Sequence, residues 1–181
     1  MNFLFPVEQQ YTSRKTSINS KRLPAVFNKA LDRKLILPNK IIFDIGCGKY
    51  DHTKTFSETT LHCSYLQYDP YNQPDEVNAV TFNRLRNEKA DYIILSNVLN
   101  VIKEPEIQEA LITLANRYLK PDGLVLCKIH EGNKSGEGKA SQEDCWQENR
   151  ATASYIKQFE SHFDLVQKKY DLIIASCPKP C

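Results

Sequence analysis

Two short motifs place acidic side chains and glycines directly after apolar segments. In the first, Asp44, Gly46, Cys47 and Gly48 follow the apolar run IIF. In the second, Asp69 ends the run SYLQYD, about 20 residues after Gly48. Glycine lets the backbone turn tightly and approach a ligand closely. An acidic residue at this spacing can accept hydrogen bonds from both hydroxyls of a ribose. Together the motifs predict a site for a nucleoside-containing ligand.

A third polar motif, SNVLNVI, covers Ser96–Ile102 and begins where another apolar run ends. The amides of Asn97 and Asn100 could hydrogen-bond a ligand at this point or orient a second substrate. Asparagine is also common in turns and at helix ends, so a purely structural role is the alternative interpretation.

The segment Glu131–Arg150 is rich in glycine in its first part and holds Trp146, Gln147 and Arg150 in its second. Glycines favour mobility, and aromatic and amide groups could stack on and read a planar substrate. This composition predicts a lid that a substrate orders. The alternative is a surface loop in which Trp146 anchors the helix that follows.

Two further side chains could act on a substrate. His130 ends a predicted strand and could be a general base, because histidine exchanges protons near neutral pH; a merely hydrogen-bonded histidine is the alternative. Lys15, followed by Thr16 and Ser17, could reach over a cofactor or bind a phosphate. Lys15 belongs to a basic region between Tyr11 and Lys40 in which Asp32 is the only acid. The region indicates contact with a phosphate-bearing substrate or a solvated helix face.

The cysteines show no close pairing typical of a metal site. Cys177 and Cys181 could share a metal or form a disulfide, but two ligands are too few for a structural metal centre. Several of the others lie in apolar runs, where cysteine behaves as a small buried hydrophobic residue. We therefore expect free thiols and no metal. The six are Cys47, Cys63, Cys127, Cys145, Cys177 and Cys181.

The composition is that of one globular domain: 181 residues, 41% of them hydrophobic and 25% charged. No apolar run approaches the roughly 18–20 residues that a membrane span needs. The apolar start lacks the basic flank and cleavage site of a secretion signal. From these observations we expect a cytoplasmic protein without a membrane partner.

Short apolar runs alternate with helical patterns after about residue 40. The runs predict strands at 40–44, 64–69, 91–96, 123–129, 163–166 and 172–176, and the helical patterns cover 23–31, 52–60, 105–118 and 155–159. Such alternation predicts an α/β fold, a mostly parallel sheet between two layers of helices. The last two strands are joined too closely for a parallel crossover, so we expect an antiparallel C-terminal hairpin.

The sequence FDIGCGKYD followed by YLQYDP resembles the first two motifs of class I, Rossmann-like, S-adenosylmethionine-dependent methyltransferases. The resemblance covers residues 40–177 and implies a seven-stranded sheet, with a less visible strand near residues 78–82. Tyr50 stands where the family commonly has a third glycine. A NAD-dependent dehydrogenase would have that glycine at Asp51, which favours a methyltransferase over an oxidoreductase.

The resemblance implies roles for individual residues. Asp44, Gly46, Cys47 and Gly48 would line the amino-acid end of the cofactor, and Asp69 would hold its ribose hydroxyls. The motif SNVLNVI would face the sulfonium and the methyl acceptor through Asn97, Val98 and Asn100. It is similar to a motif of small methyltransferases found in phages and near DNA-modification systems. It lacks the Asn/Asp-Pro-Pro-aromatic motif of standard adenine-N6 and cytosine-N4 enzymes.

These observations predict transfer of a methyl group from S-adenosylmethionine by direct in-line displacement. Asn97 and His130 are the candidate catalytic residues, and Lys15, Trp146, Gln147 and Arg150 the candidate substrate-binding ones. The acceptor could be a nucleic acid or a small molecule. A non-catalytic S-adenosylmethionine-binding regulator on the same fold is the alternative. We expect residues 1–39 to form a basic N-terminal arm and helix, and residues 40–181 the methyltransferase domain.

Overall fold

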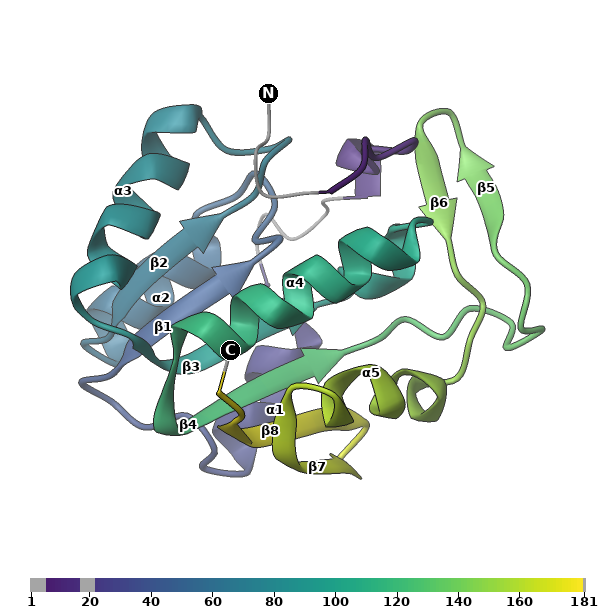
Figure 1. Ribbon diagram of the computed structural model, residues 1–181. Coiled ribbons are helices and arrows are strands. Elements are labelled where there is room, and N and C mark those ends of the chain that lie inside the picture. The colour runs from purple at the N-terminus through teal and green to yellow at the C-terminus, as the bar shows by residue number, and fades with distance from the viewer. Residues whose placement is uncertain (1–5, 17–21, 181) are drawn as a thin grey trace.

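A computed structural model describes residues 6–16 and 22–180 of the chain. Its centre is a six-stranded sheet in the order β2-β1-β3-β4-β8-β7 (Figure 1). The strands β2, β1, β3 and β4 are parallel, whereas β8 runs antiparallel to β4 and β7. This confirms the predicted parallel sheet with its C-terminal hairpin. The strands are β1 (Ile41–Ile45), β2 (Ser64–Tyr68), β3 (Ala90–Ser96), β4 (Leu119–Lys128), β7 (Phe163–Lys169) and β8 (Leu172–Pro178).

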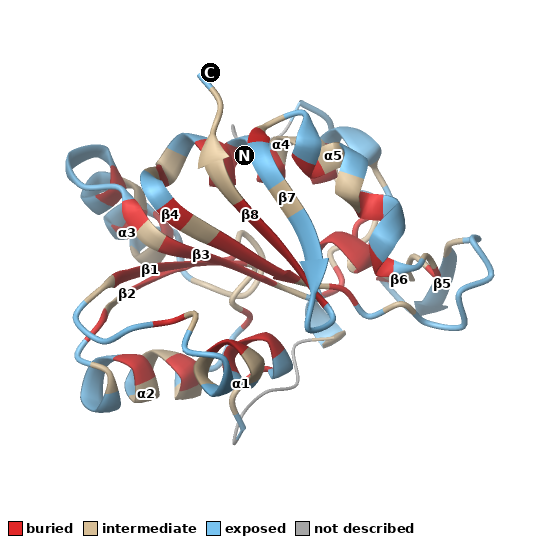
Figure 2. Ribbon diagram, turned by 90° about the horizontal axis from the view of Figure 1, so that it is seen from below, coloured by how far each residue is buried: buried red, intermediate tan, exposed pale blue. Residues whose placement is uncertain are grey.

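Helices cover both faces of the sheet, as the three-layer prediction requires. Figure 2 shows α1 and α2 on one face and α3, α4 and α5 on the other, with the most buried residues in the strands between them. Each face therefore has its own hydrophobic core. The helices are α1 (Ala25–Asp32), α2 (His52–Thr60), α3 (Asp75–Asn87), α4 (Pro105–Tyr118) and α5 (Ile156–Glu160).

Helix α4 shows how sequence pattern becomes packing. Pro105 occupies its first turn, where the missing N–H costs nothing. Ile107, Leu111 and Leu114 recur at helical spacing and are buried against the sheet. The helix ends at Tyr118, and the chain enters β4 through an irregular register opposite the start of β3.

The strand expected near residues 78–82 is wrong, because these residues lie inside α3. Asn78, Thr81 and Leu85 are buried on one side of this helix, at the spacing of a helical face. Asn78 and Thr81 also hydrogen-bond the backbone at Asp69 and Gln67. Their polar side chains therefore fix the helix to the end of β2, and β2 is an edge of the sheet.

The segment after β4 is less irregular than expected. Residues Lys139–Gln142 (β5) pair with Cys145–Gln147 (β6) in a separate two-stranded antiparallel sheet. The 3₁₀-turn η1 (Arg14–Thr16) lies beside this hairpin (Figure 1). Two regions far apart in the sequence are thus brought together above the carboxyl ends of the parallel strands. A further turn, η2 (Leu99–Val101), follows β3, and η3 (Thr152–Tyr155) precedes α5.

No helix among the residues that the structure describes is long and apolar enough to cross a membrane.

Candidate active site

The loop after β1 depends on its two glycines. Gly46 and Gly48 have φ angles of 72° and 75°, in the left-handed region that favours glycine. The Gly46 N–H donates to the carbonyl of Tyr68 at 2.7 Å, which ties the loop to the end of β2. A Cβ on Gly46 would lie 2.5 Å from Cγ2 of Val98. The position therefore requires glycine for its conformation and for its contact with Val98.

Asp69 organises the neighbouring loop through both carboxylate oxygens. Its Oδ2 accepts hydrogen bonds from the Gly48 N–H at 2.9 Å and the Asn72 side-chain amide at 3.2 Å. Its Oδ1 accepts from the N–H groups of Tyr71 and Asn72 at 3.0 and 2.9 Å. The acid predicted to hold a ribose thus also fixes the distance between the two motifs.

Asp44 is a buried carboxylate with one unused oxygen. Its Oδ2 accepts a hydrogen bond from the hydroxyl of Tyr65, whereas Oδ1 has no hydrogen-bond partner in the described part of the chain. Burial is the main cause that raises the pKa of Asp44 to about 7; the hydrogen bond from Tyr65 opposes this rise, and the charge of Asp69 adds to it. A buried acceptor without a partner is costly, which indicates that a ligand group satisfies it.

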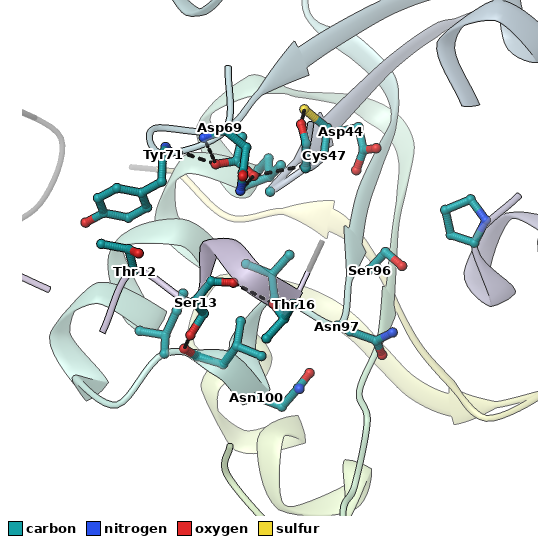
Figure 3. A pocket seen from close by; sticks show the side chains of 18 of the residues that line it. Thr12, Ser13, Thr16, Asp44, Cys47, Asp69, Tyr71, Ser96, Asn97 and Asn100 are labelled. Atoms are coloured by element: carbon teal, nitrogen blue, oxygen red, sulfur yellow. Dashed lines mark hydrogen bonds between the residues drawn. The ribbon is translucent and has the colours of Figure 1, made fainter. Parts of the chain in front are cut away.

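These residues line one cavity of about 590 Å³ at the carboxyl ends of β1, β2 and β3. Figure 3 shows Asp44, Cys47, Asp69 and Tyr71 on one side of it and Thr12, Ser13, Thr16 and Asn100 on the other. Its volume is typical of a site for a cofactor-sized ligand. Every predicted cofactor-binding residue contributes to its lining: Asp44, Gly46, Cys47, Gly48, Asp69, Asn97, Val98 and Asn100.

Asn97 and Asn100 differ in how firmly they are held. Asn97 has a φ of 57°, its backbone N–H donates to the carbonyl of Lys128 at 2.8 Å, and its side chain is exposed at the cavity. Asn100 is buried, and its amide bridges the N–H of His130 and the side chain of Gln147. The Asn97 side chain is therefore available to contact a ligand, whereas Asn100 links His130 and Gln147 in the lining of the cavity.

Of the predicted acceptor-side residues, three line the cavity and two do not. His130, Lys15 and Gln147 are part of the lining. The Trp146 ring instead stacks on Tyr11 with a centroid distance of 5.4 Å. Its indole N–H donates to Glu148. The tryptophan thus anchors the N-terminal segment rather than the helix after it.

Arg150 also lies away from the cavity. Its guanidinium stands 4.1 Å above the ring of Tyr155, hydrogen-bonds Gln108 and lies beside Glu148. These partners belong to α4, η3 and the end of the β6 segment, so the structure gives Arg150 a packing role and does not place it among the cavity residues.

Thr12, Ser13 and Asp144 form a contact that the sequence did not reveal. The Asp144 carboxylate accepts hydrogen bonds from the N–H and the hydroxyl of Thr12, and the Asp144 carbonyl accepts from the N–H of Ser13. The Ser13 hydroxyl donates to the carbonyl of Val101 at 2.9 Å. This latch, formed by Thr12, Ser13 and Asp144, holds the N-terminal segment as one wall of the cavity. Thr12 and Asp144 are 132 positions apart in the sequence, and no motif links them.

The thiols of the described residues are not arranged for chemistry. Burial raises the pKa of Cys47 and of Cys127, so neither is activated as a nucleophile. Cys47, Cys63, Cys127, Cys145 and Cys177 are free. Within residues 6–16 and 22–180, no three His, Cys, Asp or Glu side chains are grouped to hold a metal. Cys181, a partner in one expected pairing, and Ser17 lie outside the described residues.

Comparison with known proteins places the chain in a family. Residues 17–167 match the family model described as a methyltransferase domain. No curated protein matches the chain in a sequence search.

Three similar solved structures share the fold at low sequence identity. The first is the Burkholderia thailandensis 1,6-didemethyltoxoflavin-N1-methyltransferase with S-adenosylhomocysteine bound, with a TM-score of 0.57 and 14% identity over 87% of this chain and 80% of that one. The second is a glycopeptide N-methyltransferase complexed with S-adenosylmethionine, with a TM-score of 0.55 and 12% identity over 88% and 96% of the chains.

The third is the sugar N-methyltransferase from Streptoalloteichus, with a TM-score of 0.51 and 10% identity over 90% and 97% of the chains. At these identities, the three structures show that the fold is shared. The chain therefore belongs to the methyltransferase domain family and has the class I, Rossmann-like fold of S-adenosylmethionine-dependent methyltransferases.

Proposed function

We propose that the cavity beside Asp44 and Asp69 binds S-adenosylmethionine and that the chain transfers its methyl group to an acceptor. The observation that carries this proposal is the pairing of two buried carboxylates with the glycine loop. Asp44 presents an unpartnered oxygen, and Asp69 lies next to the Gly48 backbone. Structures of the same fold are known with S-adenosylmethionine or S-adenosylhomocysteine bound, which supports this choice of ligand.

The two carboxylates fit the two polar ends of this cofactor. The Oδ1 atom of Asp44 would accept a hydrogen bond from the ammonium group of the methionine end, which satisfies a buried acceptor. Asp69 would accept hydrogen bonds from the ribose hydroxyls. Its longest present bond, 3.2 Å from the Asn72 amide, is the one that a hydroxyl could replace without disturbing the backbone bonds to the loop.

The acceptor would enter from the side of Asn97 and His130. The bound cofactor would supply an electrophilic methyl group, whose C–S bonding electrons return to sulfur as the acceptor atom forms the new bond. The exposed amide of Asn97 would orient that acceptor atom. His130 would take the proton that the acceptor loses when its nucleophilic atom carries one. Positioning of this kind accounts for most of the catalysis that such a reaction needs.

The backbone of Asn97 decides which substitution isolates its side chain. Asn97 has a φ of 57°, a left-handed conformation that asparagine tolerates better than most residues. Asn97→Gly is the informative variant, because glycine adopts the same conformation and removes only the side chain. Asn97→Gly and His130→Ala should leave the cofactor Kd within about threefold of wild type and lower turnover by about 100-fold or more.

The first test is calorimetric titration with S-adenosylmethionine, S-adenosylhomocysteine and NAD. Saturable binding of the first two and no binding of NAD is the expected result. Binding of NAD alone, or of none of the three, would overturn the proposal.

Production of S-adenosylhomocysteine with nucleic-acid, protein and small-molecule pools then tests catalysis. Cofactor binding without turnover on any pool would instead indicate a regulator.

A further inference from the structure

A group of basic side chains surrounds the turn between β7 and β8, outside the cavity. Lys29 of α1 forms an ion pair with Asp171 in this turn at 3.0 Å, so the turn lies beside α1, as Figure 2 also shows. Six residues line a shallow depression at the turn: Lys29, Asp32, Arg33, Lys168, Tyr170 and Asp171. Four more lie beside them: Lys169 at Tyr170, Lys128 and Lys134 within reach of the Asp171 charge, and Glu131 paired with Lys134. We call these ten residues the hairpin surface.

The hairpin surface holds more positive charge than the whole chain. Its cations exceed its acids by three, whereas the net charge of all 181 residues is +2. Three of the cations lie close enough to Asp171 to hold its pKa below the usual value. The largest effect is that of Lys29, followed by Lys128 and Lys168. Lys168 and Lys169 are exposed on the edge strand of the sheet. Lys168 and Lys169 are therefore accessible cations, whereas Lys29 and Lys134 are held in ion pairs with Asp171 and Glu131.

The turn itself keeps two of these cations in place. Tyr170 and Asp171 have φ angles of 56° and 59°, although tight hairpin turns of this kind favour Asn-Gly. The Tyr170 ring lies 4.7 Å from the Arg33 guanidinium and 5.0 Å from the Lys169 ammonium. The turn thus places the Tyr170 ring in cation–π contact with Arg33 of α1 and Lys169 of β7.

The hairpin surface borders the cavity on two elements. Ala25 lines the cavity, and Lys29 follows one turn later on α1. On the sheet, the Lys128 carbonyl accepts the hydrogen bond from the N–H of Asn97. A long anionic molecule could therefore lie on the lysines while one of its groups enters beside Asn97 and His130.

We propose that the hairpin surface binds the phosphate backbone of a single-stranded nucleic acid whose base is the methyl acceptor. A row of phosphates matches several cations spread along one surface. A base of a single strand can enter a cavity without the energy needed to flip it out of a duplex. The identity of the acceptor rests on the proposed methyl transfer, but binding to the surface does not.

Fluorescence anisotropy with short labelled single strands of RNA and DNA tests this directly. We expect saturable binding at about 50 mM salt that weakens linearly in log–log form up to about 200 mM, because bound phosphates release counterions. Lys168→Ala/Lys169→Ala should weaken binding at least tenfold and reduce the salt slope by about 1.4, as two phosphate contacts are lost.

The matched control removes two charges from the opposite side of the sheet. Arg84→Ala/Arg86→Ala lies on α3, which packs on β2 at the far edge from β7, and should bind like wild type. Equal losses in both double variants, or no binding by wild type, would overturn the proposal. Displacement of the strand by polyglutamate at equal charge concentration would also overturn it, because the surface would then bind any polyanion.

Cofactor titrations of the same proteins separate this proposal from the previous one. Both double variants should bind S-adenosylmethionine normally, since the substituted residues do not line the cavity. Strand binding without cofactor binding would refute the methyl-transfer proposal and leave the surface assignment standing. Cofactor binding without strand binding would refute the assignment of the hairpin surface and leave the methyl-transfer proposal standing.

Discussion

Gly48 and Asp69 are joined by a hydrogen bond of 2.9 Å from the glycine N–H to the aspartate Oδ2, across 21 residues of sequence. This bond connects the loop after β1 to the end of β2. The Gly48 carbonyl also accepts a bond of 2.7 Å from the Gln73 side chain, beyond the same aspartate. The two cofactor motifs are therefore one structural unit, in which a change at either residue affects the other.

Replacement of Asp69 by alanine should lower the affinity for S-adenosylmethionine by about 100-fold or more. Each lost bond to a charged acceptor is worth about 1.5–3 kcal/mol, and the loop also loses the acceptor for three N–H groups. Asn72→Ala removes only the side-chain amide and should change Kd less than about threefold. Calorimetry measures both, and equal losses would show that Asp69 does not contact the ribose.

Replacement of Gly46 by alanine should destabilise the protein by about 2–5 kcal/mol. The left-handed backbone costs about 1–2 kcal/mol, and the contact with Val98 adds overpacking of about 1–3 kcal/mol. Gly136→Ala is the matched control, because Gly136 has a φ of 85° and nothing within 4 Å of its added Cβ. Urea unfolding should show a smaller decrease in the free energy of unfolding for Gly136→Ala than for Gly46→Ala.

In a double-mutant cycle, Gly46→Ala should cost less in a Val98→Ala background than in wild type, by the overpacking part of its effect. If Gly46→Ala is no worse than Gly136→Ala, the close contact with Val98 does not matter for stability.

Cofactor binding should strengthen as the pH rises through 7. The pKa of Asp44 is raised to about 7, so this carboxylate is mostly protonated below that pH and cannot pair with an ammonium group. Between about pH 8 and about pH 6 we expect the affinity to fall by about tenfold, and Asp44→Asn to remove this dependence. A wild-type profile as flat as that of the variant would contradict the assignment.

The same group sets a pH dependence of stability in the ligand-free protein. The folded form binds more protons than the unfolded chain between the ordinary pKa of 3.8 and the raised value of about 7. The Asp44 contribution to the free energy of unfolding should therefore decrease as the pH rises through this window. Urea titrations of wild type and Asp44→Asn at several pH values measure the difference.

Replacement of Asp144 by alanine should release the N-terminal wall of the cavity. Thr12 loses both of its hydrogen bonds to the carboxylate, and we expect hydrogen exchange at residues 9–16 to become about fivefold faster, which corresponds to about 1 kcal/mol. Bound S-adenosylhomocysteine should also dissociate faster, as measured by stopped flow.

Glu143→Ala is the control for Asp144→Ala, since it removes only an exposed ion pair with Lys15 and should have little effect. Unchanged exchange in Asp144→Ala would mean that the segment is held without this carboxylate, by contacts such as the Tyr11–Trp146 stacking and the hydrogen bonds of Ser13.

Local patterns in the sequence were sufficient for most elements. The apolar runs at β1 and β3 predict buried parallel strands, and the spacing in α4 predicts its buried face, because side-chain periodicity follows directly from backbone geometry. The strand expected at residues 78–82 was implied by the family resemblance, whereas the apolar runs predict only the six strands of the main sheet. The helical patterns missed α3, which covers these residues. There the polar residues Asn78 and Thr81 are buried by hydrogen bonds to β2, which a hydrophobicity pattern does not register.

The α/β fold, the glycine loop and the position of Asp69 could all be predicted from the sequence, because each depends on neighbouring residues or on a fixed strand-to-strand spacing. The residues that form the opposite wall of the cavity could not be predicted, because they come together only through long-range contacts. In the folded chain, Trp146 stacks on Tyr11, Arg150 lies over Tyr155, and Thr12 hydrogen-bonds Asp144. These contacts join segments that are distant in sequence, and they form only after the sheet has brought those segments together.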